Sequence, residues 1–199
     1  MKKIMFNDKY LLTQKVLKGR KTQTRRIAYT GNATIIDCGI CVEPKNIGRA
    51  TLFRGIDEIA HSRYCIGEEV AVAQAYCELV SEAGYNEEEI NKLRRSKGWT
   101  NKMYVKADLM PHRIRITDIR AERLQEISEE DCLAEGIVDF ESRINKAHFY
   151  SITDESATYG TAKKPYSLLI DKIAGKGTWK RNPYVFVYEF ELINHPLWD

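Results

Sequence analysis

The feature that most constrains the fold is an alternating segment near the end of the chain, residues 184–191. Every second residue from Tyr184 to Phe190 is aromatic, and the residues between them change from valine to glutamate. Side chains on a β-strand alternate between two faces, so this period of two predicts a strand with one aromatic face. The backbone of such a strand needs hydrogen-bond partners. The chain must therefore build a sheet around this segment.

The other elements expected from the sequence are short strands and single helices in irregular order. Strand-like composition marks residues 1–6, 68–73, 103–107 and 114–116, with shorter signals within 28–62. Helical spacing or capping marks residues 8–18, 81–97, 128–135 and 165–174. The regular strand–helix alternation that builds a doubly wound sheet is absent. We therefore expect an α+β fold, a small mixed β-barrel with peripheral helices.

The best local helix signal starts at Ser128, followed three residues later by Asp131. Serine at this position accepts a hydrogen bond from a backbone N–H of the first turn, and Asp131 is expected to close a capping box. Gly136 is a natural stop. Glu135 lies in the last turn, where its charge opposes the helix dipole by about 0.3–1 kcal/mol. An unfavourable local choice is typical of functional sites, but simple exposure also explains it.

Length and composition favour one cytoplasmic domain. The 199 residues contain no Pro/Gly/Ser-rich linker, so we expect a single domain over residues 1–199. The net charge of +3 is too small to indicate a polybasic protein. The sequence shows no secretory leader and no apolar stretch of about 20 residues, so we expect the chain neither to be secreted nor to span a membrane. Five scattered cysteines are typical of a reducing compartment.

A basic segment, Arg20–Arg26, is the main candidate for a binding site. Four of its seven residues are cationic, and threonine and glutamine lie between them. Cationic side chains bind phosphate, and hydroxyl and amide groups recognise polar edges. A solvated edge strand has a similar composition. From the residues alone the two interpretations are about equally supported.

The segment GRKTQTRR, residues 19–26, resembles the G-x-K-T-x-T-x-R signature of the ASCH-domain family, whose members have a PUA-like β-barrel. Further segments resemble the longer, phage- and prophage-associated members of that family, namely residues 63–70, 110–114, 127–136 and 179–185. The resemblance covers most of the chain in order and leaves out insertions near 78–100 and 139–164. Longer members often have a glutamate where this chain has Gln74.

The resemblance implies a site for a modified nucleoside or for RNA. Small bacterial N4-acetylcytidine amidohydrolases of this family are similar at Lys21 and Thr24, and their glutamate best matches Glu135. This implies a nucleoside- or RNA-directed amidohydrolase without a cofactor or a metal ion, with these three residues catalytic. The alternatives are a non-catalytic RNA-binding module and a ribonuclease that uses the same basic cleft. Protein partners are not indicated.

The three residue types fit amide hydrolysis. A threonine hydroxyl needs a base beside it, and a lysine can serve if burial and neighbouring arginines lower its pKa. A carboxylic acid can protonate the leaving amine. On a regular strand Lys21 and Thr24 would point to opposite faces, so they converge only at a turn or bulge. Gly19 makes a turn there plausible.

Other candidates carry weaker signals. Residues expected to contact substrate or RNA are Arg20, Gln23, Arg25, Arg26, Arg113, Lys180 and Arg181. Trp179 can stack on a base, but packing against the barrel is the favoured interpretation. Four residues with zinc-ligand chemistry are Cys38, Cys41, His61 and Cys65. Because no second C-x-x-C pair follows the first, a structural zinc site is not the favoured interpretation.

Overall fold

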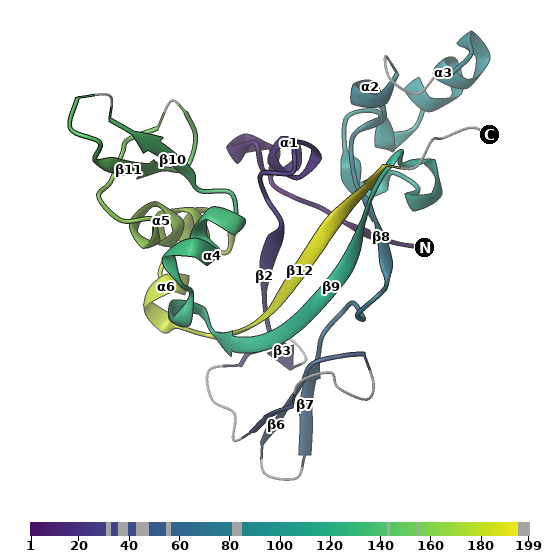
Figure 1. Ribbon diagram of the computed structural model, residues 1–199. Helices are drawn as coiled ribbons and strands as arrows, with labels where there is room; N and C mark the ends of the chain where they lie inside the picture. The colour runs from purple at the N-terminus through teal and green to yellow at the C-terminus, as the bar shows by residue number, and fades with distance from the viewer. Residues whose placement is uncertain are drawn as a thin grey trace.

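A computed structural model describes residues 1–30, 33–35, 40–42, 48–54, 57–80, 85–142, 144–154 and 156–194. It has a mixed α+β fold whose largest sheet has five strands (Figure 1). In spatial order these strands are β1 (Lys2–Ile4), β8 (Glu69–Val72), β9 (His112–Arg123), β12 (Tyr184–Asn194) and β2 (Gln23–Ile27). Strands β1 and β8 are parallel and the other neighbours are antiparallel.

Strand β12 confirms the expectation drawn from the alternating segment and lies between β9 and β2. Phe186, Tyr188 and Phe190 are buried on its aromatic face. The ring of Tyr188 meets that of Tyr64 edge-on, with 5.2 Å between ring centroids. A register shift at Glu189/Phe190 interrupts the pairing with β9, and bulges of this kind increase the bend of a strand.

The sheet is curved but open in the described part of the chain, where its edge strands β1 and β2 do not pair with each other. The expectation of a barrel is therefore supported only as far as a mixed α+β fold with a bent sheet. Strand β1 is only three residues long. Beyond it, the Arg26 side chain donates to the Met5 carbonyl at 2.8 Å, so a side chain and not a backbone ladder joins the two edges.

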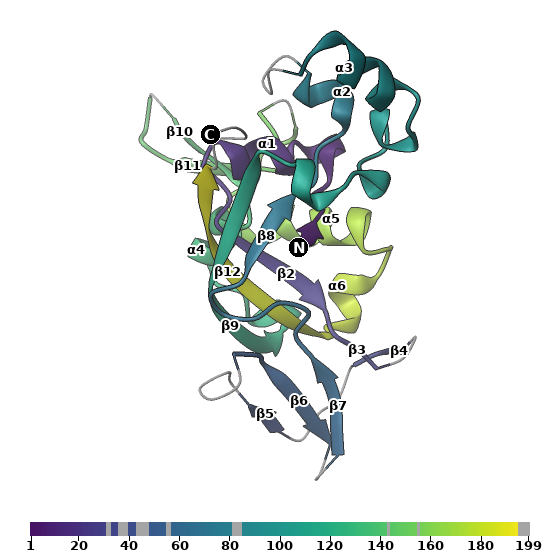
Figure 2. The same ribbon diagram turned by 90° about the vertical axis from the view of Figure 1, so that its right-hand side faces the viewer.

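Three small sheets accompany the large one. Their strands are β3 (Tyr29–Thr30) with β4 (Ala33–Thr34), β5 (Ile40–Val42) with β6 (Thr51–Arg54) and β7 (Asp57–His61), and β10 (Val138–Glu141) with β11 (His148–Ser151). Strands β6 and β7 lie at one end of the molecule, opposite α2 and α3, in both views (Figures 1 and 2).

The helices form two groups. The α-helices are α1 (Leu12–Leu17), α2 (Tyr76–Leu79), α3 (Glu87–Arg94), α4 (Glu129–Ala134), α5 (Lys163–Ile173) and α6 (Thr178–Arg181). Short 3-10 helices are η1 (Asp8–Tyr10), η2 (Lys97–Trp99), η3 (Lys102–Tyr104), η4 (Ala107–Leu109) and η5 (Leu124–Glu126). Helices α4, α5 and α6 gather beside β2 and one end of β9 and β12, away from α2 and α3 (Figure 1).

The prediction of a strand over residues 103–107 is wrong. The chain forms η3 and η4 there, and Val105 lies between them. Val105 is buried in a small second cluster with Tyr76 and Leu79. Three alternating residues are too few to distinguish a strand from an irregular segment that buries one side chain.

The helix expected to begin at Pro165 starts two residues earlier, at Lys163, and is followed by Gly175 with a positive φ of 104°. The packing expected for Trp179 is confirmed, because its ring lies edge-on against Tyr166 at 6.1 Å and against the main core. None of the helices in the described ranges is long and apolar enough to cross a membrane.

Candidate active site

Helix α4 has the N-cap that the sequence indicates. The Ser128 hydroxyl accepts a hydrogen bond from the Asp131 N–H at 3.0 Å. The carboxylate of Asp131 does not close the expected capping box. It accepts instead from Arg25 at 2.6 Å and from Arg120 at 2.8 Å. Asp131 therefore ties the first turn of α4 to strands β2 and β9.

Glu135 lies at the other end of α4 and is buried. Its Oε2 accepts from Lys21 Nζ at 2.6 Å, and its Oε1 lies 3.3 Å from Arg25 Nη1. Two cations therefore compensate a charge that opposes the helix dipole. Gly136 follows with φ of 98°, a conformation that lets the chain leave the helix directly after this carboxylate.

Lys21 is one of the most buried side chains in the protein, with 2% of its surface exposed. Its Nζ donates to the Gln23 carbonyl at 2.7 Å and, in Glu135, to the backbone carbonyl at 2.8 Å and the carboxylate at 2.6 Å. An ammonium group has three hydrogens, so all of them are used. In this arrangement Lys21 is the protonated half of a buried ion pair.

Burial lowers the pKa of Lys21 below its usual value, against the opposing effect of Glu135. Arg26 and Arg25 lower the pKa further, as the sequence suggested. The pKa of Lys15 is also lowered, to about 8, mainly by burial and with smaller contributions from Lys21 and Arg20.

Thr24 and Lys21 reach the same cavity because only Thr24 lies on the regular part of strand β2. Lys21 precedes the strand, after a turn at Gly19 with φ of 68°. This turn resolves the conflict of side-chain directions expected on a continuous strand. In the described part of the chain, the Thr24 hydroxyl takes part in no hydrogen bond, although the residue is buried.

Lys21, Thr24 and Glu135 line one cavity of about 710 Å³. Its apolar wall comes from β12, η5 and α5 and includes Val185, Leu124 and Ile170. The ring of Phe6 also lines it, with Lys21 Nζ at 5.8 Å from the ring centroid. Three polar side chains of complementary chemistry therefore meet at an apolar cavity.

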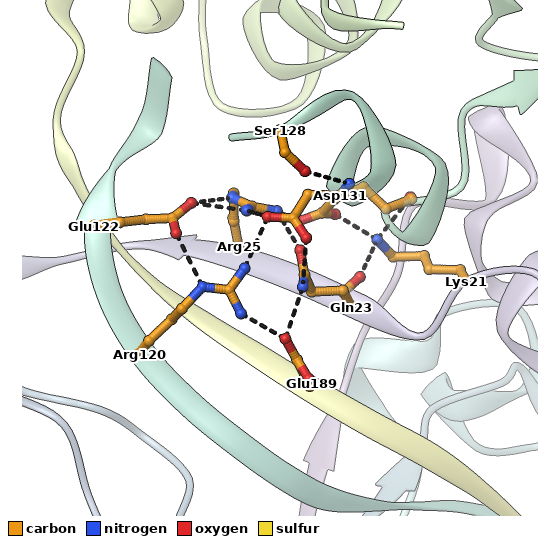
Figure 3. Close-up of polar contacts among 9 residues, drawn as sticks. Lys21, Gln23, Arg25, Arg120, Glu122, Ser128, Asp131 and Glu189 are labelled. Carbon is orange, nitrogen blue, oxygen red and sulfur yellow. Dashed lines mark hydrogen bonds and ion pairs between the residues drawn. The ribbon is translucent and has the colours of Figure 1, made fainter. Parts of the chain in front are cut away.

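A partly buried polar network supports this site from β2, β9, β12 and α4 (Figure 3). Arg25, whose side chain is 1% exposed, donates to Glu122 at 2.7 Å and to Asp131 at 2.6 Å. The Gln23 amide donates to Asp131 and to Glu189, both at 3.2 Å. Gln23 and Arg25 are thus bound to protein carboxylates, and their geometry gives no support to the expected contacts with RNA or substrate.

The other predicted contact residues are dispersed. Arg26 lines the cavity, but Arg20 is exposed and lines a separate hollow beside Lys15. Arg113, Lys180 and Arg181 do not line the cavity. Arg181 donates to the Thr178 hydroxyl at 2.9 Å within α6. The structure therefore brings Lys21, Thr24, Arg25, Arg26 and Glu135 together at one cavity, and it places Arg20, Arg113, Lys180 and Arg181 elsewhere.

Tyr166 is a cavity residue that the sequence did not single out. It is fully buried, and its hydroxyl has no hydrogen-bond partner among the described residues. Burial, with Glu135 next in effect, raises the pKa of Tyr166 well above its usual value, so the hydroxyl keeps its proton. The sequence pattern that could have identified Tyr166 is helical spacing, because it lies three residues before Leu169 and four before Ile170, on the inner face of α5.

The zinc hypothesis concerns residues that are only partly described. Cys38 and the side chain of Cys41 lie outside the described residues. His61 lies 3.1 Å from the Thr51 hydroxyl, and Cys65 accepts from Arg49 at 3.0 Å. Over the described ranges, no group of three or more histidine, cysteine or acidic side chains has metal-binding geometry.

Gln74 is buried just after β8. At this position the longer members of the family that the sequence resembles often have a glutamate. Gln74 does not line the cavity that holds Lys21, Thr24 and Glu135. The only carboxylate that joins Lys21 in the described part of the chain is that of Glu135.

We expect Gly136→Ala to lower the free energy of unfolding by about 1–3 kcal/mol, since a side chain at positive φ is strained. An added Cβ would lie 3.2 Å from Lys15 Cδ and 3.5 Å from Lys21 Cβ. Urea denaturation measures the loss. Gly160→Ala is the matched control, because no atom lies within 4 Å of its added Cβ and its φ is outside the left-handed region. Equal losses in the two variants would contradict a special role for Gly136.

Comparison with known proteins gives no match to this chain among family models, curated proteins or solved structures.

Proposed function

We propose that the chain is an ASCH-domain hydrolase with a PUA-like fold that removes an acyl group from the exocyclic amine of a nucleobase, as in N4-acetylcytidine. The observation that carries the proposal is the cavity shared by Lys21, Thr24 and Glu135. These are the positions that the family resemblance implies are catalytic. The bent five-stranded sheet supports the PUA-like part of the proposal.

The cavity suits a nucleoside in size and chemistry. Small-molecule sites usually occupy about 300–1,000 Å³ and combine apolar walls with a few polar groups. This one has about 710 Å³ and places Phe6 and Ile170 near Thr24 and Lys21. An aromatic base can pack on the apolar wall while its acylated amine faces the polar residues.

In the proposed reaction, the first proton transfer takes place within the ion pair. Lys21 passes a proton over the 2.6 Å contact to Glu135, which gives a neutral amine and a carboxylic acid. Burial favours this neutral pair because it lowers the pKa of Lys21. The Thr24 oxygen then attacks the acyl carbon while its proton moves to Lys21.

Collapse of the tetrahedral intermediate breaks the carbon–nitrogen bond, and Glu135 protonates the leaving amine. Cytidine leaves, and Thr24 carries the acetyl ester. The ammonium of Lys21 and the carboxylate of Glu135 are regenerated. Water then adds to the ester, one of its protons returns to the Thr24 oxygen through the same two residues, and acetic acid departs.

In the binding-only alternative, Lys21, Arg25 and Arg26 contact phosphate, and the same geometry argues against the first two of these contacts. Both side chains are buried and bound to carboxylates. A phosphate would have to displace these acidic partners and enter a region that already holds several negative charges. The ribonuclease alternative uses the same cleft, with Lys21 or Glu135 assisting a 2′-hydroxyl, and differs from the amidase in its product.

Turnover of N4-acetylcytidine by the purified protein tests the proposal. We expect cytidine to be released by the wild type, and kcat to fall at least about 100-fold in Lys21→Ala and in Thr24→Val. Thr24→Ser is the matched control, because it keeps the hydroxyl and is expected to retain turnover. Absence of turnover in the wild type, or an active Thr24→Val variant, would refute the proposal, and shortened RNA would indicate the ribonuclease.

A further inference from the structure

A second cavity, of about 380 Å³, adjoins the candidate active site. The two share four lining residues, Met5, Arg26, Ile27 and Tyr29. The second cavity extends from these residues along β1 and β12 to the end of β7, where it meets Arg63 and Tyr64. Arg26 and Met5, which are joined by the 2.8 Å hydrogen bond, line both cavities, so a ligand that is longer than one nucleoside and fills both would lie against this pair.

The lysine, arginine and acidic residues that line the second cavity are of one charge sign, positive. Its described residues include Lys3, Arg26 and Arg63 but no aspartate or glutamate. In the described ranges neither of these arginines has a carboxylate within ion-pair distance, whereas Arg25 and Arg120 each have at least two. The paired arginines are thus part of the framework, while Arg26 and Arg63 keep N–H groups for another anion.

Aromatic rings accompany these cations. Tyr29, at the junction of the two cavities, is a large side chain with 52% of its surface exposed. Arg63 lies 5.7 Å from the centroid of the Tyr64 ring, and Arg26 lies 5.7 Å from that of Phe6. Of these three rings, those of Phe6 and Tyr64 are buried, and Tyr29 offers the exposed face. An exposed ring on which a base can stack, beside arginines that can contact the backbone, is the chemistry of single-stranded nucleic acid binding.

We propose that the substrate is a nucleotide within a single-stranded RNA, whose adjoining phosphate lies between Arg26 and Arg63 and whose next base stacks on Tyr29. This inference rests on the proposed function for the identity of the base in the first cavity. Two observations support the inference independently of that function: Arg26 lines both cavities, and the second cavity has no acidic residue among its described lining. It distinguishes the protein from one that acts on free nucleosides alone.

The test is fluorescence anisotropy with a fluorescein-labelled pentacytidine RNA that carries N4-acetylcytidine at its centre. We expect the wild type to bind this RNA more tightly than free N4-acetylcytidine, measured by competition. Arg63→Ala is expected to weaken RNA binding about tenfold, as for loss of one charge-assisted hydrogen bond. Its slope of log K against log salt is expected to be smaller by about 0.7, the value for one phosphate contact on a single strand.

Arg94→Ala is the matched control. Arg94 is also exposed and lies 5.6 Å from the centroid of an aromatic ring, that of Trp99, but it belongs to α3 at the opposite end of the molecule from β7 (Figure 2). Its replacement removes the same charge and the same type of ring contact. RNA binding is expected to be unchanged in this variant.

Equal RNA affinities in Arg63→Ala and Arg94→Ala would overturn the inference, as would a wild type that binds the RNA no better than the nucleoside. Binding of N4-acetylcytidine 5′-monophosphate as tight as that of the pentanucleotide would also overturn it, because a single phosphate would then suffice. Release of the acetyl group is followed in the same samples. If RNA binding depends on Arg63 but no acetyl group is released, the second cavity is supported as an RNA-binding site and the proposed hydrolase activity is refuted.

Discussion

Arg25→Met is expected to lower the free energy of unfolding by about 3–5 kcal/mol, the range for removal of one partner from a buried ion pair. The guanidinium is almost inaccessible to solvent and lies within 3.3 Å of carboxylate oxygens of Glu122, Asp131 and Glu135. Methionine fills a similar volume without a charge, so the loss would come mainly from unpaired carboxylates. Urea denaturation at pH 7 measures it.

Arg115→Met is the matched control for this measurement. Arg115 lies on β9 and is exposed, and it pairs with Glu69 and Glu191 at 3.2 Å each. Exposed pairs contribute about 0–1 kcal/mol, so the control should lose little. Similar losses in the two variants would contradict the view that the Arg25 network stabilises the fold.

The effect of Arg25 should also depend on pH through Asp131. Burial raises the pKa of Asp131, but the hydrogen bond and charge of Arg25, with Arg120, outweigh it and hold the pKa below its usual value. The folded state therefore binds this proton more weakly than the unfolded state. The corresponding stability is present above about pH 4, the usual pKa of an aspartate, and is lost as the pH falls through the folded-state value. The difference between wild type and Arg25→Met should narrow below about pH 4.

Local signals predicted several parts of the site. The alternation at residues 184–191 placed β12, and Ser128 with Gly136 placed the ends of α4 and thus Glu135. Gly19 indicated the turn that brings Lys21 toward Thr24. Each of these signals acts within a few residues, through side-chain alternation, a cap or a positive φ. The sequence therefore carries them without knowledge of the fold.

The roles of the individual cations depended on contacts far along the chain. Arg25 and Arg26 are neighbours with the same chemistry, yet Arg25 meets Glu122 and Asp131 about 100 residues away, while Arg26 faces the two cavities. Only the pairing of β2 with β12, and of β12 with β9, decides which arginine is buried. The expected barrel is confirmed only as far as a mixed α+β fold with a five-stranded sheet, for a similar reason, because closure depends on whether two edge strands meet.

Replacing Lys21 with methionine should lower the free energy of unfolding by about 3–5 kcal/mol, because Glu135 would keep only its longer contact with Arg25. Glu135→Gln should also destabilise the protein, since it leaves the Lys21 ammonium buried without a charged partner. The double variant should lose less than the sum, with a coupling energy of about 1–3 kcal/mol. Urea denaturation of wild type, both single variants and the double variant gives this value.

A parallel cycle on Arg115 and Glu191, an exposed pair at 3.2 Å, is the control and should give a coupling below about 1 kcal/mol. The comparison also bears on the reaction, because the proposed proton transfer requires Lys21 and Glu135 to share a proton directly. Strict additivity at Lys21 and Glu135 would mean that no such contact exists in solution. Lys21 would then have no route for the proton that it must release before it can accept one from Thr24.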